Sequence, residues 1–143
     1  MNREIKFRIW DKSFKKFLED DYESKNVIDG DGNLFMYVLS ETFRDLYFYK
    51  LLKNIEISEY TGLKDKNGKE IYEGDIIKLI YFRNRRRKET GKVVFLNHQA
   101  SFGIIDRDGN EYPLYRNTAE QIEVIGNIYE NFELTEKGNN YGK

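Results

Sequence analysis

The residues best placed to contact another molecule form a short basic run near the middle of the chain. Five of the six residues from 83 to 88 are basic. Guanidinium groups bind phosphate oxygens through paired hydrogen bonds, and lysine adds a point charge. The run is therefore a candidate contact for nucleic acid or for an acidic partner: Arg83, Arg85, Arg86, Arg87 and Lys88. The alternative is a solvated loop between two strands, whose charges keep sheet edges apart or pair with acidic residues.

Three acidic, glycine-containing segments resemble calcium-binding loops. An EF-hand loop needs oxygen ligands at positions 1, 3 and 5, glycine at position 6 and glutamate at position 12. Counting from Asp29, Asp65 or Asp106 places leucine or glutamate at position 6 and serine, isoleucine or asparagine at position 12. The sequence therefore predicts hairpin turns at these places, with no metal site and no other cofactor.

The side chains needed for catalysis are scarce. The chain has no cysteine, and its one histidine, His98, lies in a predicted exposed turn. A nucleophile needs a base within reach, and no Gly-x-Ser-x-Gly, glycine-rich phosphate loop or His-Glu-x-x-His spacing occurs. Pairs such as Asp20 with Asp21, or Glu19 with Glu23, lie in a polar connection. We therefore expect a protein that is not an enzyme, and keep a hydrolase with an unrecognised carboxylate site as a weaker alternative.

Charge and hydropathy exclude several broad classes. The 24 basic and 25 acidic residues give a net charge of −1, so no global field attracts nucleic acid or an anionic membrane. No stretch approaches the roughly 20 apolar residues of a membrane span. The first residues alternate charge with hydrophobicity instead of forming the apolar run of a signal peptide. With no cysteine for disulfides, the sequence predicts a soluble, cytoplasmic protein without a membrane partner.

The elements that must position these residues begin with two hairpins. Ile5, Phe7 and Ile9 fall on one side of a segment that alternates with period two, which is typical of a half-buried strand. Residues 14–18 can return beside it. A second hairpin is predicted around the glycine-containing turn at 29–33, which lies between two apolar runs.

Residues 41–53 are ambiguous. Apolar side chains recur at i, i+3, i+4 and i+8 from Phe43, behind Ser40 as a possible N-cap, which favours an amphipathic helix. Three consecutive aromatic residues at 47–49 favour a strand instead. The prediction adopted is a helix over 41–53, with a strand as the open alternative.

Short strands follow one another regularly after residue 74. Their ranges are 75–82, 91–96, 101–105, 111–115 and 121–125. Five strands at this spacing predict a small barrel of the SH3-like kind. Pro113 is the only proline, so its strand should lie at a sheet edge or be bulged. Thr118 and Gln121 suggest one helical turn before the last strand, and residues 135–143 should form a flexible tail.

Three stretches together resemble a known family. They are Arg3-Glu4-Ile5-Lys6-Phe7-Arg8-Ile9-Trp10-Asp11, the segment from Tyr60 to Ile77, and Val124-Ile125-Gly126-Asn127-Ile128-Tyr129-Glu130-Asn131. In type and order they resemble the YopX family of small phage and prophage proteins. The family usually has proline where this chain has Phe132, and its middle segment is variable. The resemblance implies a phage or prophage origin, a bacterial host cell and a β-rich fold with an SH3-like barrel in the second half. It implies no established activity.

The central stretch of this resemblance is rich in turn residues. Glycine takes the left-handed conformation that tight turns need, and aspartate and asparagine bond to nearby backbone. A structural role is therefore favoured over a ligand site for its members: Thr61, Gly62, Asp65, Asn67, Gly68, Glu73, Gly74 and Asp75.

These observations predict a mainly β protein with an N-terminal β-hairpin subdomain, one helix and a C-terminal SH3-like five-stranded barrel. The predicted boundaries are 1–60 for the hairpin and helix subdomain, 61–74 for a turn-rich junction, 75–134 for the barrel and 135–143 for the tail. The expected function is that of a non-catalytic accessory protein that binds a host or phage protein. Association with further copies of the chain is also expected, because sheet edges and aromatic patches favour it. A nucleic-acid-binding module using residues 83–88 is the alternative.

Overall fold

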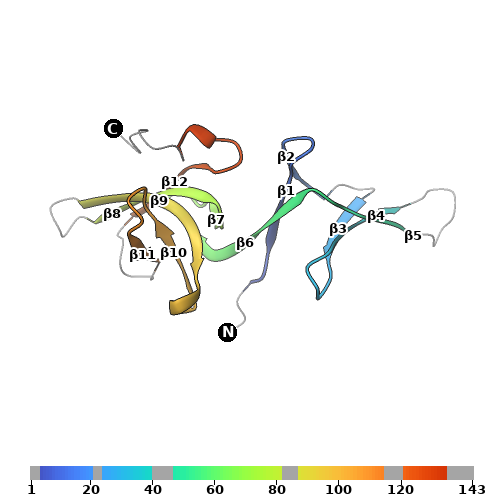
Figure 1. Ribbon diagram of the computed structural model, residues 1–143, viewed down its shortest axis with the longest axis horizontal. Coiled ribbons are helices and arrows are strands. Elements are labelled where there is room, and N and C mark those ends of the chain that lie inside the picture. The colour runs from blue at the N-terminus through green and yellow to red at the C-terminus, as the bar shows by residue number, and fades with distance from the viewer. Residues whose placement is uncertain (1–3, 21–23, 40–46, 82–86, 115–120, 135–143) are drawn as a thin grey trace. The chain divides into compact units, whose positions relative to one another are not determined.

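The protein is built almost entirely of antiparallel strands (Figure 1). A computed structural model describes residues 4–20, 24–39, 47–81, 87–114 and 121–134. Within these ranges the helical elements are two short 3-10 turns, η1 (Asn97–Gln99) and η2 (Phe132–Leu134). The predicted mainly β fold class is therefore confirmed.

The first sheet has four strands in the order β2-β1-β6-β7. Their bounds are β1 Phe7–Asp11, β2 Lys16–Leu18, β6 Ile55–Lys64 and β7 Glu70–Tyr72. The predicted first hairpin is confirmed, because β1 pairs with β2. The predicted buried face of this segment is only partly buried. Ile9 is buried, but Phe7 is 45% exposed and Ile5 is 67% exposed.

The second sheet corrects the predicted helix. Its strands are β3 (Ser24–Ile28), β4 (Leu34–Leu39) and β5 (Tyr47–Leu51), in that order. The helix over 41–53 is wrong for 47–51, and residues 40–46 lie outside the described residues. The physical reason is the antiparallel backbone pairing of β5 with β4, in which residues 47–51 lie opposite residues 35–39.

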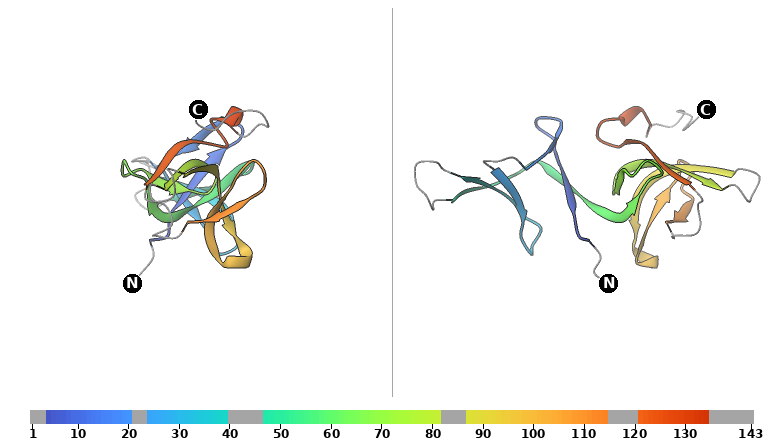
Figure 2. Two further views of the ribbon diagram at one scale, coloured as in Figure 1. Left: turned by 90° about the vertical axis from the view of Figure 1, so that its left-hand side faces the viewer. Right: turned by 180° about the vertical axis from the view of Figure 1, so that it is seen from behind.

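The third sheet is the predicted five-stranded one. Its strands are β8 Asp75–Tyr81, β9 Arg87–Leu96, β10 Ser101–Ile105, β11 Glu111–Pro113 and β12 Gln121–Asn127. Strands β8 to β11 form a meander, and β12 pairs with β8 to give the order β11-β10-β9-β8-β12. The sheet twists and curls strongly into a half-barrel, which Figure 2 shows from two further sides. Pro113 lies in edge strand β11, as predicted.

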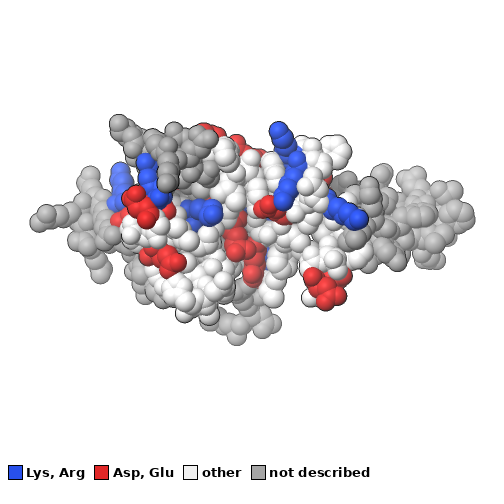
Figure 3. All heavy atoms as spheres, viewed as in Figure 1, with Lys and Arg blue, Asp and Glu red and all other residues white. Residues whose placement is uncertain are grey.

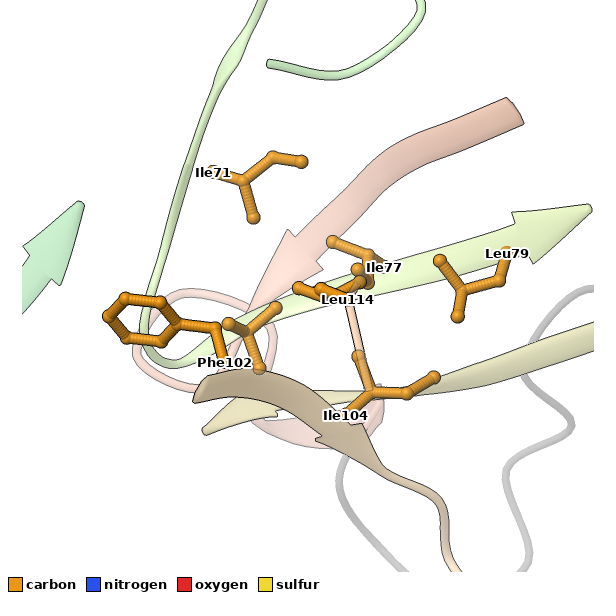
Figure 4. Packing of buried hydrophobic residues seen from close by; sticks show 7 residues of the cluster. Ile71, Ile77, Leu79, Phe102, Ile104 and Leu114 are labelled. Atoms are coloured by element: carbon orange, nitrogen blue, oxygen red, sulfur yellow. The ribbon is translucent and has the colours of Figure 1, made fainter. Parts of the chain in front are cut away.

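The concave side of this sheet holds a hydrophobic core (Figure 4). Its buried members are Ile71, Ile77, Leu79, Val93, Phe102, Ile104 and Leu114. Ile71 comes from β7, so the segment before the barrel contributes to the same core. Each such side chain stabilises the fold by about 1.5 to 3 kcal/mol through burial.

The chain divides into two compact units. One comprises Met1–Phe7 with Ser58–Lys143, and the other comprises Arg8–Ile57. The predicted boundaries at 60, 74 and 134 stay predictions. The predicted tail at 135–143 lies outside the described residues. Of the predicted helical turn, Thr118 also lies outside them, and Gln121 is the first residue of β12. No helix in the described part of the chain is both long and apolar enough to cross a membrane.

Candidate functional site

Asp65 lies at the centre of the turn between β6 and β7. Its carboxylate Oδ1 accepts the backbone N–H groups of Asn67 at 2.8 Å and Lys69 at 2.9 Å. Its own N–H donates to the Lys69 carbonyl at 2.8 Å, and its carbonyl accepts from the N–H of Gly68, whose φ is +82°. The turn is therefore held by one carboxylate and by a glycine in the left-handed region.

The same arrangement recurs in the other two turns that resembled calcium loops. Oδ1 of Asp29 accepts the N–H groups two and four residues on, and Oδ1 of Asp106 does the same. In both of these turns the second oxygen accepts the side-chain amide of the asparagine at the fourth position, Asn33 or Asn110. The predicted hairpin turns are confirmed at all three places.

The Asp65 turn differs because lysine replaces that asparagine. Oδ2 of Asp65 accepts the N–H of Val124 in β12 at 3.1 Å, and the N–H of Lys66 donates to the Ile122 carbonyl at 2.8 Å. β12 is an edge strand of the third sheet. The turn thus satisfies backbone groups on the outer side of an edge strand, where another chain could otherwise pair.

The electrostatics of Asp65 follow from these contacts. Burial by itself would raise the pKa of its carboxyl. The backbone donors of Val124, Lys69 and Asn67, with the charge of Lys69, outweigh burial and hold the pKa below its ordinary value. The carboxylate is therefore charged at neutral pH and fully used in holding the turn against β12.

A second turn joins β7 to β8. The carboxylate of Asp75 accepts the N–H of Tyr72 at 2.9 Å, and the N–H of Gly74 donates to the Val93 carbonyl at 3.0 Å. Gly74 has φ +82°. A Cβ there would lie 3.2 Å from Ile128 and 3.3 Å from Tyr129. Glycine is therefore required at this turn both by its backbone conformation and by its neighbours.

Glu73 lies beside this turn with its carboxylate against β6. Its Oε2 accepts the N–H of Glu59 at 3.2 Å, and its own N–H donates to the Glu59 carbonyl. Burial raises the pKa of this carboxyl above its ordinary value, although a backbone hydrogen bond from Phe95 acts in the opposite direction. Glu73 is thus a partly buried acid that is held close to backbone.

Thr61 and Gly62 complete the turn-rich stretch. The Thr61 hydroxyl donates to the Ile71 carbonyl at 2.9 Å and accepts the Leu63 N–H at 3.2 Å. Gly62 has φ +84°, at a place where the pairing of β6 with β7 shifts register. All of these contacts are made within the chain. The structural role of the stretch stays a prediction, and these contacts support it.

The basic run lies at the β8–β9 hairpin. Arg83, Arg85 and Arg86 fall in 82–86, outside the described residues. Arg87 and Lys88 are not loop residues as predicted, because they open β9 opposite Tyr81 and Ile80. Lys88 shares one sheet face with Lys78 and Lys92, since side chains on a strand alternate and directly paired residues point the same way.

The other candidates for chemistry each make local contacts of their own. The His98 Nε2 atom is 3.2 Å from an oxygen of Glu111, and both side chains are largely exposed. One oxygen of Asp20 accepts the backbone and side-chain N–H groups of Asn26, while Asp21 and Glu23 lie outside the described residues. Among the residues the structure describes, no three His, Cys, Asp or Glu side chains gather in a group that could hold a metal ion.

The sequence pattern missed an exposed apolar strip at the start of the chain. Lys6 is fixed from one side: its Nζ pairs with Glu70 at 2.6 Å and with Glu4 at 3.0 Å, and it lies 5.5 Å from the centre of the Tyr60 ring. Its carbonyl accepts the N–H of Tyr60 at 2.9 Å. The side chains on either side of it, Ile5 and Phe7, remain exposed. Period two identified this face, but it does not show whether anything covers the face.

Comparison with known proteins gives consistent results for the fold. The protein yopX from Bacillus subtilis superposes with a TM-score of 0.61 at 23% sequence identity, covering 91% of this chain and 97% of that one. Protein EF1440 from Enterococcus faecalis superposes with a TM-score of 0.54 at 24% identity, covering 94% and 100%. The comparison with curated proteins found no significant match. The model of the YopX protein family matches residues 6–136. The chain belongs to the YopX family.

Proposed function

We propose that the chain is a non-catalytic accessory protein of a phage or prophage that acts by binding a host or phage protein. The observation that carries this proposal is the exposed apolar strip formed by Ile5 and Phe7. Large apolar side chains at the centre of a contact supply much of the affinity of protein interfaces. The phage origin rests on what membership of the family implies.

The strip is suited to binding because it is held in place before any partner arrives. The ion pair of Lys6 with Glu70 and the backbone bond from Tyr60 fix the residue between the two apolar side chains. A partner therefore does not have to order this segment, and less binding energy is lost to conformational entropy. Single exposed apolar residues are common on protein surfaces, whereas here two of them lie on one side of an anchored segment.

The experiment is an affinity capture from host-cell lysate treated with nuclease, with wild type and Phe7→Ser as parallel baits. We expect a protein retained by the wild type and depleted on the variant. Val27→Ser is the matched control, because Val27 is an exposed apolar strand residue elsewhere in the chain. Equal capture by all three baits would remove the strip from the proposal. Capture of no protein by the wild type would contradict the function itself.

A nucleic-acid-binding module is the second candidate, and the lysine face of the β8–β9 hairpin favours it. Lys78, Lys88 and Lys92 share one side of the two strands that lead into the basic run. Glu123 stands opposite Lys78 and pairs with Lys66 at 3.0 Å, so the face is not purely basic. Figure 3 accordingly shows basic and acidic atoms next to one another over this sheet. This mixture is why the candidate comes second.

Salt dependence separates the two candidates. If the hairpin contacts phosphates, the affinity for a single-stranded or duplex DNA probe falls steeply as salt increases. On duplex DNA, the slope of the logarithm of affinity against the logarithm of salt concentration becomes more negative by about 0.9 for each phosphate neutralised. Changing Arg85, Arg86 and Arg87 to Ala should reduce that slope. An affinity that does not respond to these substitutions would contradict phosphate contact by the run.

A further inference from the structure

The turn between β1 and β2 presents an aromatic side chain among lysines. Phe14 is 76% exposed, the largest exposed fraction among the large apolar side chains described. Lys15 and Lys16 follow it, and the Lys16 Nζ atom lies 6.0 Å from the centre of the Phe14 ring. Within the described ranges neither lysine forms an ion pair. We call Phe14, Lys15 and Lys16 the basic tip.

Hydrogen bonds hold the turn that carries the basic tip. Oδ1 of Asp11 accepts the N–H groups of Ser13 at 2.8 Å and Phe14 at 3.0 Å. The side-chain amide of Asn54 donates to the Ser13 hydroxyl at 2.8 Å. The backbone carbonyl of Asn54 accepts the N–H of Lys12. Lys15 has φ +51°, a conformation that costs a residue with a Cβ about 1 to 2 kcal/mol.

A surface of opposite character lies near the end of the described chain. Phe132 is 65% exposed in η2, and Glu130 and Glu133 flank it. Residues 121–134 contain three acidic residues and no basic residue. We call Glu130, Phe132 and Glu133 the acidic patch.

The acidic patch is also held in place. The side-chain oxygen of Asn127 accepts the N–H groups of Tyr129 at 3.0 Å and Glu130 at 2.8 Å. Its amide donates to a Glu130 carboxylate oxygen at 2.7 Å, and the Asn131 side-chain oxygen accepts the Asn127 N–H at 3.1 Å. Glu133 is exposed to solvent, and its carboxylate accepts a long hydrogen bond of 3.5 Å from the side-chain amide of Asn131.

We propose that copies of this chain associate through the basic tip of one copy and the acidic patch of another. Each surface has one exposed phenylalanine and two charges, and the charges are opposite in sign, so apolar contact and electrostatic attraction act at the same place. Tip and patch are different surfaces, so one contact leaves each copy with an unused partner surface. Assembly therefore continues past a pair unless the copies close into a ring.

The contact is small, which determines how it must be tested. Six side chains supply much less area than the roughly 1,200 to 2,000 Å² of a stable interface, so the association is weak and concentration-dependent. Sedimentation velocity of the full chain, from about 1 µM to about 1 mM, covers the range in which such a contact forms. We expect the mean mass to rise above that of the 17.2 kDa monomer as the concentration increases. The rise should shrink at about 1 M salt, where the Debye length falls to about 3 Å.

Charge exchange makes the test specific. The double variant Lys15→Glu with Lys16→Glu and the variant Glu133→Lys should each lose association by at least about tenfold, and an equimolar mixture of the two should recover it. Glu130 is left unchanged because it holds the Asn127 turn. Phe14→Ser should weaken association by about tenfold or more, and circular dichroism checks its fold. The double variant Lys88→Glu with Lys92→Glu, and the variant Asp108→Lys, make the same charge changes on exposed residues elsewhere and should have no effect.

Two results would overturn the proposal. One is a wild type that stays monomeric throughout the concentration range. The other is an association that is unchanged in Phe14→Ser and in both charge variants, or that the mixture does not restore. Neither result bears on binding through Ile5 and Phe7, because that strip shares no residue with the tip or the patch.

Discussion

At the scale of single residues, Asp65 shows how one carboxylate converts a common hairpin turn into a contact with another strand. Asp29 and Asp106 hold similar turns, but both of their oxygens are used inside the turn. Asp65 instead directs its second oxygen to Val124. The residue four positions on is lysine and not asparagine, so no side-chain amide from that position competes for this oxygen.

The first prediction compares two of these aspartates. Asp65→Ala removes the acceptor of three backbone N–H groups, and the N–H of Val124 is partly buried. The substitution should therefore lower the free energy of unfolding by about 2 kcal/mol. Asp29→Ala should cost less, because its turn is exposed and water can replace the carboxylate. Urea denaturation of both variants provides the measurement. Equal losses would mean that the contact with β12 adds no stability.

The same carboxylate determines a pH response. Its pKa is lower in the folded chain than in the unfolded chain. The resulting stability is present above the unfolded value of about 3.9 and is lost as pH falls through the folded pKa. Glu73 has the opposite sign: its folded pKa is raised, so it favours folding below about pH 4.3, and this contribution is lost as pH rises toward the folded pKa.

The second prediction isolates Glu73. Glu73→Gln keeps the side chain's shape and an acceptor oxygen but cannot ionise. The free energy of unfolding of the variant minus that of wild type should therefore increase between about pH 4 and pH 7. Denaturation at a series of pH values checks the change. A difference that stays constant, or that decreases with rising pH, would contradict the burial assigned to this carboxyl.

At the scale of elements, the turn between β7 and β8 combines two demands on one glycine. Gly74 and Gly68 have the same φ of +82°, but a Cβ at Gly68 would meet nothing within 4 Å. The pair therefore separates the cost of the backbone conformation from the cost of crowding. The turn before β8 must fit against Ile128 and Tyr129, whereas the turn before β7 faces open space.

The third prediction uses that pair. Gly68→Ala should destabilise the fold by about 1 to 2 kcal/mol, the cost of a Cβ in the left-handed region. Gly74→Ala should cost about 1 kcal/mol more, because the new methyl group forces Ile128 and Tyr129 to move. Thermal or chemical unfolding of both variants measures the difference. Equal losses of stability in the two variants would show that Ile128 and Tyr129 can move without lowering the stability of the fold.

The strands of the barrel were predictable because each has turn residues on both sides. The predicted bounds of β10 agree with the structure at both ends. The predicted bounds of β8, β11 and β12 agree with it to within two residues. β9 begins at Arg87 and not at 91, because pairing with β8 continues into the basic run. Sequence periodicity cannot show how far a partner strand extends. The basic run itself was found from composition, but its contacts were not.

The segment around β5 was mispredicted for a related reason. Phe43, Tyr47 and Leu51 have helical spacing, the aromatic residues at 47–49 favour a strand, and the pairing with β4 decides between the two. That pairing is non-local, so a window of sequence does not contain it. The candidate interaction surfaces were missed similarly. Alternation predicted that Ile5 and Phe7 share a face, but exposure depends on what the rest of the chain covers.

At the scale of the whole molecule, the two compact units differ in size. The unit of Met1–Phe7 and Ser58–Lys143 has 93 residues, and the unit of Arg8–Ile57 has 50. A smaller unit buries a smaller fraction of its surface on folding and is therefore more marginally stable. We therefore expect Arg8–Ile57 to open before the rest of the chain unfolds.

The last prediction tests this order of opening by hydrogen exchange and mass spectrometry on the full chain. Peptides from β3 and β4 should exchange at a lower free energy than those from β8, β9 and β10. Leu34→Ala, which truncates a side chain that is 1% exposed, should reduce protection by about 2 to 5 kcal/mol within Arg8–Ile57 only. Ile104→Ala is the matched change in the other unit, and it should lower protection wherever opening requires unfolding of the barrel. If Leu34→Ala reduced protection equally in β8 to β10, the two units would unfold as one cooperative structure, because a local opening cannot transmit its cost to a core that stays closed.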